Sequence, residues 1–125
     1  MSASEAVVRE FCAAWSRRDV EELIAFFKPD AIYHNIPLPA AQGHDAIRGV
    51  MQLFVPTSQE IEFEILNIAS DGNLVITERV DRFKMGDVQI ELPVAGVFEI
   101  EDGKIAAWRD YFDMQSWTNQ MSGGS

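Results

Sequence analysis

Two segments of the sequence combine charged and aromatic residues in a pattern suited to acid–base chemistry. Arg79 and Asp81 are two residues apart on an expected β-strand, so their side chains point to the same face. On a later expected strand, Asp110 lies between Trp108 and Phe112 on one face, where a carboxyl group is expected to be buried. A buried carboxylate needs a partner, and a planar guanidinium can bridge two carboxylates. The spacing therefore offers an Asp–Arg–Asp set, provided that the two strands lie close together.

The same spacing also fits a simpler interpretation. An Arg–Asp pair on a strand is commonly a solvated ion pair that contributes about 0–1 kcal/mol to stability. Arg109 is adjacent to Asp110, and neighbouring charges of this kind are often only surface charge. On spacing alone we slightly favour this interpretation, because the pattern does not place the two strands side by side.

A third segment adds two polar side chains. Tyr33 and Asn35 share strand parity, and the polar end of each can hold a water molecule. Taken alone, the segment fits equally well a tyrosine at a strand end and an asparagine in the turn before Pro37.

Metal, cofactor and nucleophile sites are not expected. His34 and His44 are the two histidines, and no second ligand stands at zinc spacing from either. Cys12 lies on an apolar helical stripe without a basic residue on that face, so we expect it in the core rather than as a nucleophile. The sequence also lacks a glycine-rich phosphate loop and a G-x-S-x-G motif.

Composition restricts the class of protein. The 125 residues suit one domain, which we assign to residues 1–120, with a flexible tail at residues 121–125. The net charge of −10 makes nucleic acid and anionic membranes unexpected partners. One cysteine excludes an intrachain disulfide, and no apolar run is long enough for a transmembrane helix. Because the start of the sequence does not resemble a signal peptide, we expect a cytoplasmic protein.

The spacing of the apolar residues changes along the chain and indicates which elements carry these residues. Apolar residues at helical spacing predict three helices: one over residues 4–17, one from Asp19 to Pro29 that buries Phe27, and one after Gly43. From residue 59 the apolar residues alternate instead, and turn residues separate four strands that begin near residue 59, 74, 88 and 105.

This order of elements predicts an α+β fold. Three helices would pack on one face of a strongly curved, mostly antiparallel sheet. Pro93 and Gly96 mark an edge, a bulge or a bend in the third of the four strands. A sheet curved in this way would enclose a concave pocket against the helices.

Taken together, the three segments resemble the limonene-1,2-epoxide hydrolase family. The similar stretches are Tyr33–Pro39, Thr77–Asp81 and Trp108–Asp113, in the same order and approximate spacing over about residues 4–115. That family belongs to the cone-shaped, cystatin-like folds that include nuclear transport factor 2, SnoaL-like proteins and ketosteroid isomerase. The resemblance implies this fold with a deep apolar pocket, and a homodimer. The short polar C-terminal end departs from the family pattern.

The resemblance also implies a reaction and a role for each residue. Water would add in one step to a small apolar epoxide, terpene-like or cyclic, and give a vicinal diol without a cofactor or a covalent enzyme intermediate. Asp110 would be the general base, and Tyr33 and Asn35 would hold the water. Asp81 would be the general acid, with Arg79 between the two carboxylates. The apolar lining expected for such a substrate comprises Leu53, Phe83, Leu92, Val94, Phe98, Trp108 and Phe112.

Two other functions remain open at this point. An isomerase or cyclase of the ketosteroid isomerase or polyketide cyclase type could use Tyr33 and Asp110. Arg79 fits that reading poorly, because a cation favours the ionised form of a carboxylic acid that must donate a hydrogen bond. A non-catalytic module that binds a small ligand is the third possibility, because this fold hosts many. The complete set of polar residue types argues against it.

Overall fold

The helices form where the sequence supplies apolar stripes and capping side chains. The computed structural model describes residues 2–123, and its helices are α1 (Ala3–Ala14), the 3₁₀ helix η1 (Trp15–Arg17), α2 (Val20–Ile24), α3 (His44–Phe54) and α4 (Met114–Met121). Ser2 caps α1 by accepting a hydrogen bond from the backbone N–H of Glu5, and Asp19 caps α2 by accepting one from that of Glu22. The three helical regions predicted in the first half of the chain are therefore present.

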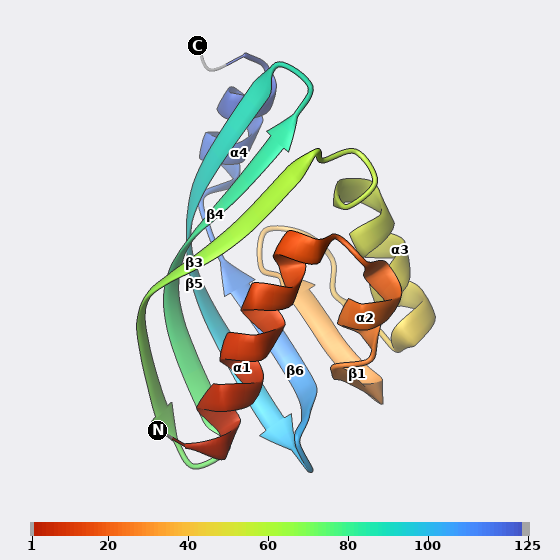
Figure 1. Cartoon of the computed structure of the whole chain (residues 1–125), viewed down its shortest axis with the longest axis vertical. Coiled ribbons are helices and arrows are strands. Elements are labelled where there is room, and N and C mark those ends of the chain that lie inside the picture. The colour runs from red at the N-terminus through yellow and green to blue at the C-terminus, as the bar shows by residue number, and fades with distance from the viewer. Residues whose placement is uncertain (1, 124–125) are drawn as a thin grey trace.

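Six strands form one curled sheet that does not close into a barrel, and its long members are strongly bent (Figure 1). The strands are β1 (Phe27–Asn35), β2 (Ala41–Gln42), β3 (Glu60–Asp71), β4 (Leu74–Met85), β5 (Val88–Glu101) and β6 (Lys104–Tyr111). Across the sheet their order is β2-β1-β6-β5-β4-β3, and all neighbours are antiparallel except β1 and β6, which are parallel. This arrangement confirms the predicted α+β class with a mostly antiparallel, curved sheet.

The core lies between the concave side of the sheet and the helices, with α1 resting against the bent strands (Figure 1). Phe11 and Trp15 from the α1 region meet Phe98 and Trp108 from β5 and β6 in a cluster of buried rings. Burying an aromatic side chain contributes about 1.5–3 kcal/mol to the stability of the fold. This cluster therefore packs the helices firmly against the concave face of the sheet. Within residues 2–123, no helix is long and apolar enough to cross a membrane.

The second helix is shorter than its pattern predicts. It ends at Ile24 rather than near Pro29, and Phe27 begins β1 instead of belonging to the helix. Pro29 lies within β1, where the pairing with β6 is irregular between Phe27 and Ile32. A proline is tolerated there because the irregular pairing does not use the backbone N–H that proline lacks. Pairing of β1 with β6 thus overrides the local helical spacing.

The C-terminal segment also differs from the prediction. Residues 121–125 were expected to form a tail, but Met121 is the last residue of α4, and residues 124 and 125 lie outside the described residues. Asp113 caps α4 by accepting a hydrogen bond from the backbone N–H of Gln115. With only eight residues, such a helix gives little periodic signal.

One glutamine attaches α4 to the sheet. The Gln120 side chain accepts a hydrogen bond from the Glu91 backbone N–H at 2.7 Å and donates one to the Glu91 carbonyl at 3.0 Å. Glu91 belongs to the first half of β5, which has no partner in β6, because β6 pairs with β5 only from Ala95 onward. The amide of Gln120 thus takes the place of a neighbouring strand and holds α4 beside the open end of the concave face (Figure 1).

Candidate active site

Strand register brings four separated residues into one row of the sheet. Thr77 on β4 is paired with Gly96 on β5, and Gly96 is paired with Asp110 on β6. On its other side Asp110 is paired with Asn35 through the parallel register of β1 and β6. Paired residues in neighbouring strands point to the same face. This row therefore sets Asp110 between Asn35 and Gly96 on the concave side.

The Arg79 guanidinium bridges Asp81 and Asp110 through four hydrogen bonds. Its Nε and Nη2 donate to the two carboxylate oxygens of Asp81 at 3.0 and 2.8 Å. Its Nη1 and Nη2 donate to those of Asp110 at 3.2 and 2.8 Å. All three side chains are buried, and Arg79 is only 1% exposed. Because bidentate pairs of this kind fix the geometry of both partners, the two carboxyl groups and the guanidinium form one rigid unit rather than a solvated surface pair.

Gly96 leaves the space through which Arg79 reaches Asp110. The guanidinium comes from β4 and the carboxylate from β6, so the arginine side chain must cross β5 between them. It crosses over Gly96, where a methyl group would overlap Arg79 Nη1 and lie 2.7 Å from Asp110 Oδ1. Beside Gly96, Thr77 Oγ1 accepts a hydrogen bond from Arg79 Nη1 at 3.1 Å. The sequence pattern suggested an edge, bulge or bend at this glycine, but its lack of a side chain is what the site requires.

Trp108 holds Asp110 from the core side. Its indole Nε1 donates a hydrogen bond to Asp110 Oδ1 at 2.6 Å. The ring is stacked between Tyr33, at 4.2 Å between ring centroids, and Phe98, at 5.5 Å. A fully buried ring clamped on both faces has little freedom to move, so Trp108 fixes the direction in which Asp110 points.

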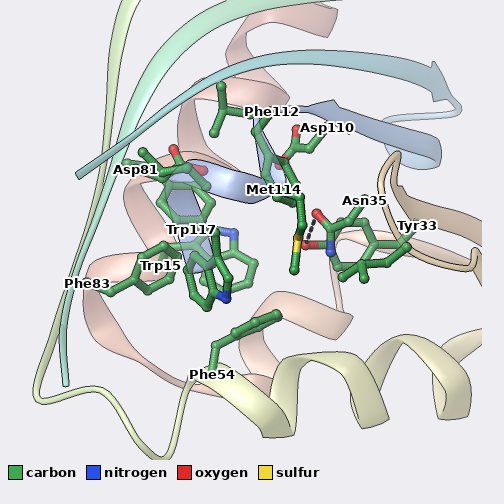
Figure 2. Close-up of a pocket in the computed structure, with 14 residues that line it drawn as sticks. Trp15, Tyr33, Asn35, Phe54, Asp81, Phe83, Asp110, Phe112, Met114 and Trp117 are labelled. Carbon is green, nitrogen blue, oxygen red and sulfur yellow. Dashed lines mark hydrogen bonds between the residues drawn. The ribbon is translucent and has the colours of Figure 1, made fainter. Parts of the chain in front are cut away.

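Tyr33 and Asn35 lie beside Asp110 on β1. Tyr33 Oη donates a hydrogen bond to Asn35 Oδ1 at 3.2 Å, and both residues are buried. Figure 2 shows this pair on one side of the cavity into which Asp81 and Asp110 also face. The amide group of Asn35 can still donate and the phenol oxygen can still accept, so the pair is able to hold a further polar molecule next to Asp110.

Burial controls the protonation of this unit. It raises the pKa of Asp81 to about 6, while Arg79 opposes that rise and the charge of Asp110 adds to it. Burial lowers the pKa of Arg79, but the two carboxylates outweigh burial and hold that pKa well above its ordinary value. Burial also raises the pKa of Tyr33. The guanidinium therefore stays charged, the phenol stays neutral, and Asp81 can keep a proton well above the pH at which an exposed aspartate loses it.

An open cavity of about 520 Å³, including its mouth, lies in front of the two carboxyl groups (Figure 2). Its four polar lining residues are those just described, and the rest of the lining is apolar. The lining residues are Trp15, Tyr33, Asn35, Leu38, Phe54, Phe63, Asp81, Phe83, Leu92, Val94, Asp110, Phe112, Met114 and Trp117. Among the described residues, no group of His, Cys, Asp and Glu side chains could hold a metal ion.

The structure places the seven predicted lining residues in three different environments. Four of them line the cavity: Phe83, Leu92, Val94 and Phe112. Phe98 and Trp108 are fully buried behind it and support the polar residues instead. Leu53 is 69% exposed and is absent from the lining. On a helix with 3.6 residues per turn, Leu53 lies on the opposite side from the buried Met51, so the helical period explains the error.

Several lining residues were not predicted. Phe54 lies on the apolar side of α3, and Trp15 on that of the first helix, so their patterns gave a usable signal. Phe63 alternates with glutamates on β3 and could have been recognised in the same way. Met114 and Trp117 belong to α4, which docks through contacts of Gln120 and Trp117 with distant segments that the local sequence does not reveal.

Comparison with known proteins identifies relatives that cover almost the whole chain. The limonene-1,2-epoxide hydrolase catalytic domain family matches residues 2–122. The epoxide hydrolase EphG of Mycobacterium tuberculosis (strain ATCC 25618 / H37Rv) is 33% identical over 109 residues, which cover 86% of this chain and 71% of that protein. A solved structure of an LEH-like epoxide hydrolase from M. tuberculosis matches with a TM-score of 0.79 at 29% identity, over 97% of this chain and 91% of the other.

More distant structures share the fold. A putative SnoaL-like polyketide cyclase from Shewanella putrefaciens CN-32 matches with a TM-score of 0.85 at 18% identity and covers 98% of both chains. At that identity the likeness shows the fold alone, whereas the family match extends over the residues of all three predicted segments. The chain therefore belongs to the limonene-1,2-epoxide hydrolase family and is an epoxide hydrolase.

Proposed function

We propose that the enzyme adds water to a small, largely apolar epoxide in one step and without a cofactor. Asp110 removes a proton from a water held by Tyr33 and Asn35, and the water oxygen attacks an epoxide carbon. The bond between that carbon and the epoxide oxygen breaks, and Asp81 donates its proton to the departing oxygen. The observation that carries this proposal is the Arg79 bridge, which aims two carboxyl groups at one apolar cavity.

The contacts of the two carboxyl groups support different roles. Asp110 accepts hydrogen bonds from three N–H donors, two on Arg79 and one on Trp108. Asp81 accepts from two, both on Arg79. Donors of this kind stabilise a carboxylate relative to a carboxylic acid. Two close carboxyl groups in a dry site share one negative charge most easily, so Asp110, which accepts more hydrogen bonds, suits the base and Asp81 suits the acid.

The rate gains expected from one general acid and one general base are large enough for this reaction. Water is a weak nucleophile and an alkoxide is a poor leaving group, so both ends of the reaction need help. One positioned acid or base typically accelerates a reaction by about 10²–10⁴-fold, which corresponds to roughly 3–5 kcal/mol of barrier for each. Arg79 keeps both groups in place through the proton transfers and lowers the cost of the charge that they carry.

The direct test is hydrolysis of a panel of terpene-like and cyclic epoxides in ¹⁸O-labelled water. Under single-turnover conditions with enzyme in excess, direct attack by water places the label in the diol. An ester intermediate would instead leave label in the enzyme and unlabelled oxygen in the first diol. A steroid enone assayed beside the panel tests isomerase activity. Turnover of the enone, or label in Asp81 or Asp110, would contradict the proposal.

The raised pKa of Asp81 predicts a specific pH dependence. Because the acid must be protonated to act, kcat/KM should fall as pH rises through about 6, by about tenfold per pH unit above it. The measurement is kcat/KM between about pH 5 and pH 9, with the enzyme-free rate subtracted and folding followed by circular dichroism. A rate that stays flat across this range would show that Asp81 does not donate the proton.

We further propose that a second copy of the chain covers the outer face of the sheet, as family resemblance implies. Ile76 and Tyr111 are on this face and are 48% and 46% exposed. Ile76 lies on β4 and Tyr111 on β6, the two strands that flank β5, and Ile76 is paired with the half-buried Val97 of β5. Apolar residues that face solvent on a sheet are typical of a two-fold contact between identical chains.

Replacing Ile76 with Asp should therefore weaken the dimer, with an increase in its dissociation constant of at least about tenfold. Light scattering over a range of protein concentrations measures the change. Leu53→Asp is the matched control, because Leu53 is more exposed than Ile76 but lies on α3. A wild-type protein that is monomeric at every concentration, or a dimer that Ile76→Asp does not weaken, would contradict this interface.

A further inference from the structure

One buried hydrogen-bond donor in the cavity wall has no partner. Trp15 is 1% exposed and lines the cavity, yet its indole Nε1 is the one buried side-chain nitrogen or oxygen of residues 2–123 without a hydrogen bond. The other indole in this core, that of Trp108, donates to Asp110. An unpaired buried donor costs about 1–3 kcal/mol, so each such exception needs an explanation, and a bound molecule that completes the contact is one.

The surroundings of this donor favour an organic ligand over a fixed water. The Trp15 ring is stacked on Phe63, at 4.6 Å between ring centroids, and packs edge-on against Phe11 and Trp108. A buried water needs about 2–4 polar partners, and these aromatic neighbours offer none. An oxygen that belongs to a larger apolar molecule needs only the one donor, because the rest of that molecule fills the apolar space.

The proposed reaction leaves this donor without a role. Tyr33, Asn35 and Asp110 handle the attacking water, and Asp81 handles the epoxide oxygen. We infer that Trp15 is a specificity-determining residue whose indole N–H binds a second oxygen of the substrate. The preferred epoxide then has an apolar body and one further acceptor, a carbonyl or an ether, away from the epoxide ring. This inference rests on the proposed function and narrows its substrate class.

Isosteric substrate pairs test the inference. The first pair is 1,2-epoxycyclohexane with an isopropenyl or an acetyl group at carbon 4, and the second carries an ethyl or a methoxy group there, with all diastereomers included. The readout is the kcat/KM of the oxygen-containing member divided by that of its hydrocarbon partner. In wild-type enzyme this ratio should exceed the ratio in Trp15→Phe by about 3- to 10-fold for at least one pair. A general loss of activity from altered packing cancels in the ratio.

Trp117→Phe is the matched control, because Trp117 also lines the cavity but is only partly buried. Its ratio should stay within about twofold of the wild-type ratio. If Trp15→Phe leaves the ratio unchanged for every pair, or slows both members equally, the indole N–H does not select a second oxygen and the inference is wrong. Failure of the proposed function gives a different result, since the wild-type enzyme would then hydrolyse none of these epoxides.

A binding measurement covers the cases in which Trp15→Phe does not fold or no epoxide reacts. In ¹⁵N-labelled wild-type protein, the three indole N–H signals are assigned with Trp117→Phe and with the strong hydrogen bond of Trp108. Acetylcyclohexane should move the Trp15 signal downfield, whereas isopropenylcyclohexane should not. Equal shifts with both compounds, or no shift with either, would overturn the inference.

Discussion

Replacing Asp110 with Asn should lower kcat/KM for epoxide hydrolysis by about 10²–10⁴-fold while the fold survives. Asparagine has nearly the same shape, and its one oxygen can still accept the hydrogen bonds that Oδ1 of Asp110 accepts from Arg79 Nη1 and Trp108. It loses the hydrogen bond from Arg79 Nη2 and cannot remove a proton from water. The substitution also removes a negative charge that raises the pKa of Asp81. Asp81 would then lose its proton at a lower pH, so the variant reduces the fraction of enzyme with a proton to donate as well as removing the base.

Diol formation by Asp110→Asn is measured against Asp87→Asn, which makes the same chemical change in an exposed turn between β4 and β5. Circular dichroism and thermal unfolding confirm that both variants are folded. Asp81→Asn should also abolish diol formation, because an amide cannot supply the proton that the leaving oxygen needs. Retention of more than about a tenth of wild-type activity in either site variant would remove the proposed mechanism.

The local part of this site could be predicted from the sequence because a strand has a period of two. Arg79 and Asp81 share a face for that reason, and so do Trp108 and Asp110. The helical period likewise identifies the buried side of α3, and applied more strictly it excludes Leu53 from the cavity. Each of these inferences depends only on residues a few positions apart, where the backbone geometry fixes the relative direction of side chains.

The non-local part could not be predicted, because register and docking depend on distant segments. Nothing near Asp110 in the sequence shows that Asn35 is its neighbour, since the parallel pairing of β1 with β6 joins segments about 75 residues apart. The position of α4 depends on contacts with distant segments, those of Gln120 with Glu91 and of Trp117 with Phe54 and Phe83. For Trp108 the strand period predicts an inward direction, but only the completed packing turns its N–H toward Asp110.

The buried charges also explain why the site is rigid. Removing one partner from a buried ion pair typically costs about 3–5 kcal/mol, because an uncompensated charge remains. Arg79 has two carboxylate partners and is almost completely enclosed, and its guanidinium carbon lies 5.2 Å from the centroid of the Phe63 ring. Separating Arg79 from either carboxylate would leave at least one charge without a partner in an apolar core. The closed arrangement is therefore held by the same desolvation that raises the pKa of Asp81.

Gly96→Ala should damage this unit by adding a single methyl group where Arg79 crosses β5. The new Cβ would overlap Arg79 Nη1 and press on Asp110 Oδ1, which are held by the hydrogen bonds that define the site. Overpacking of this kind costs about 1–3 kcal/mol of stability. Misplacing a catalytic group by about 1 Å can cost about 10²-fold in rate. We expect both losses, with the loss of kcat/KM exceeding what the reduced stability explains.

Gly49→Ala provides the control, because Gly49 lies within α3 and nothing is within 4 Å of its added Cβ. Alanine is favoured over glycine in a helix by about 1 kcal/mol, so this variant should unfold at a slightly higher temperature. Gly96 does not have a positive φ, so backbone strain cannot account for a loss at that position. If Gly96→Ala unfolds at the wild-type temperature and keeps its rate, Arg79 can reach Asp110 by another path, and the space above Gly96 is not what the site needs.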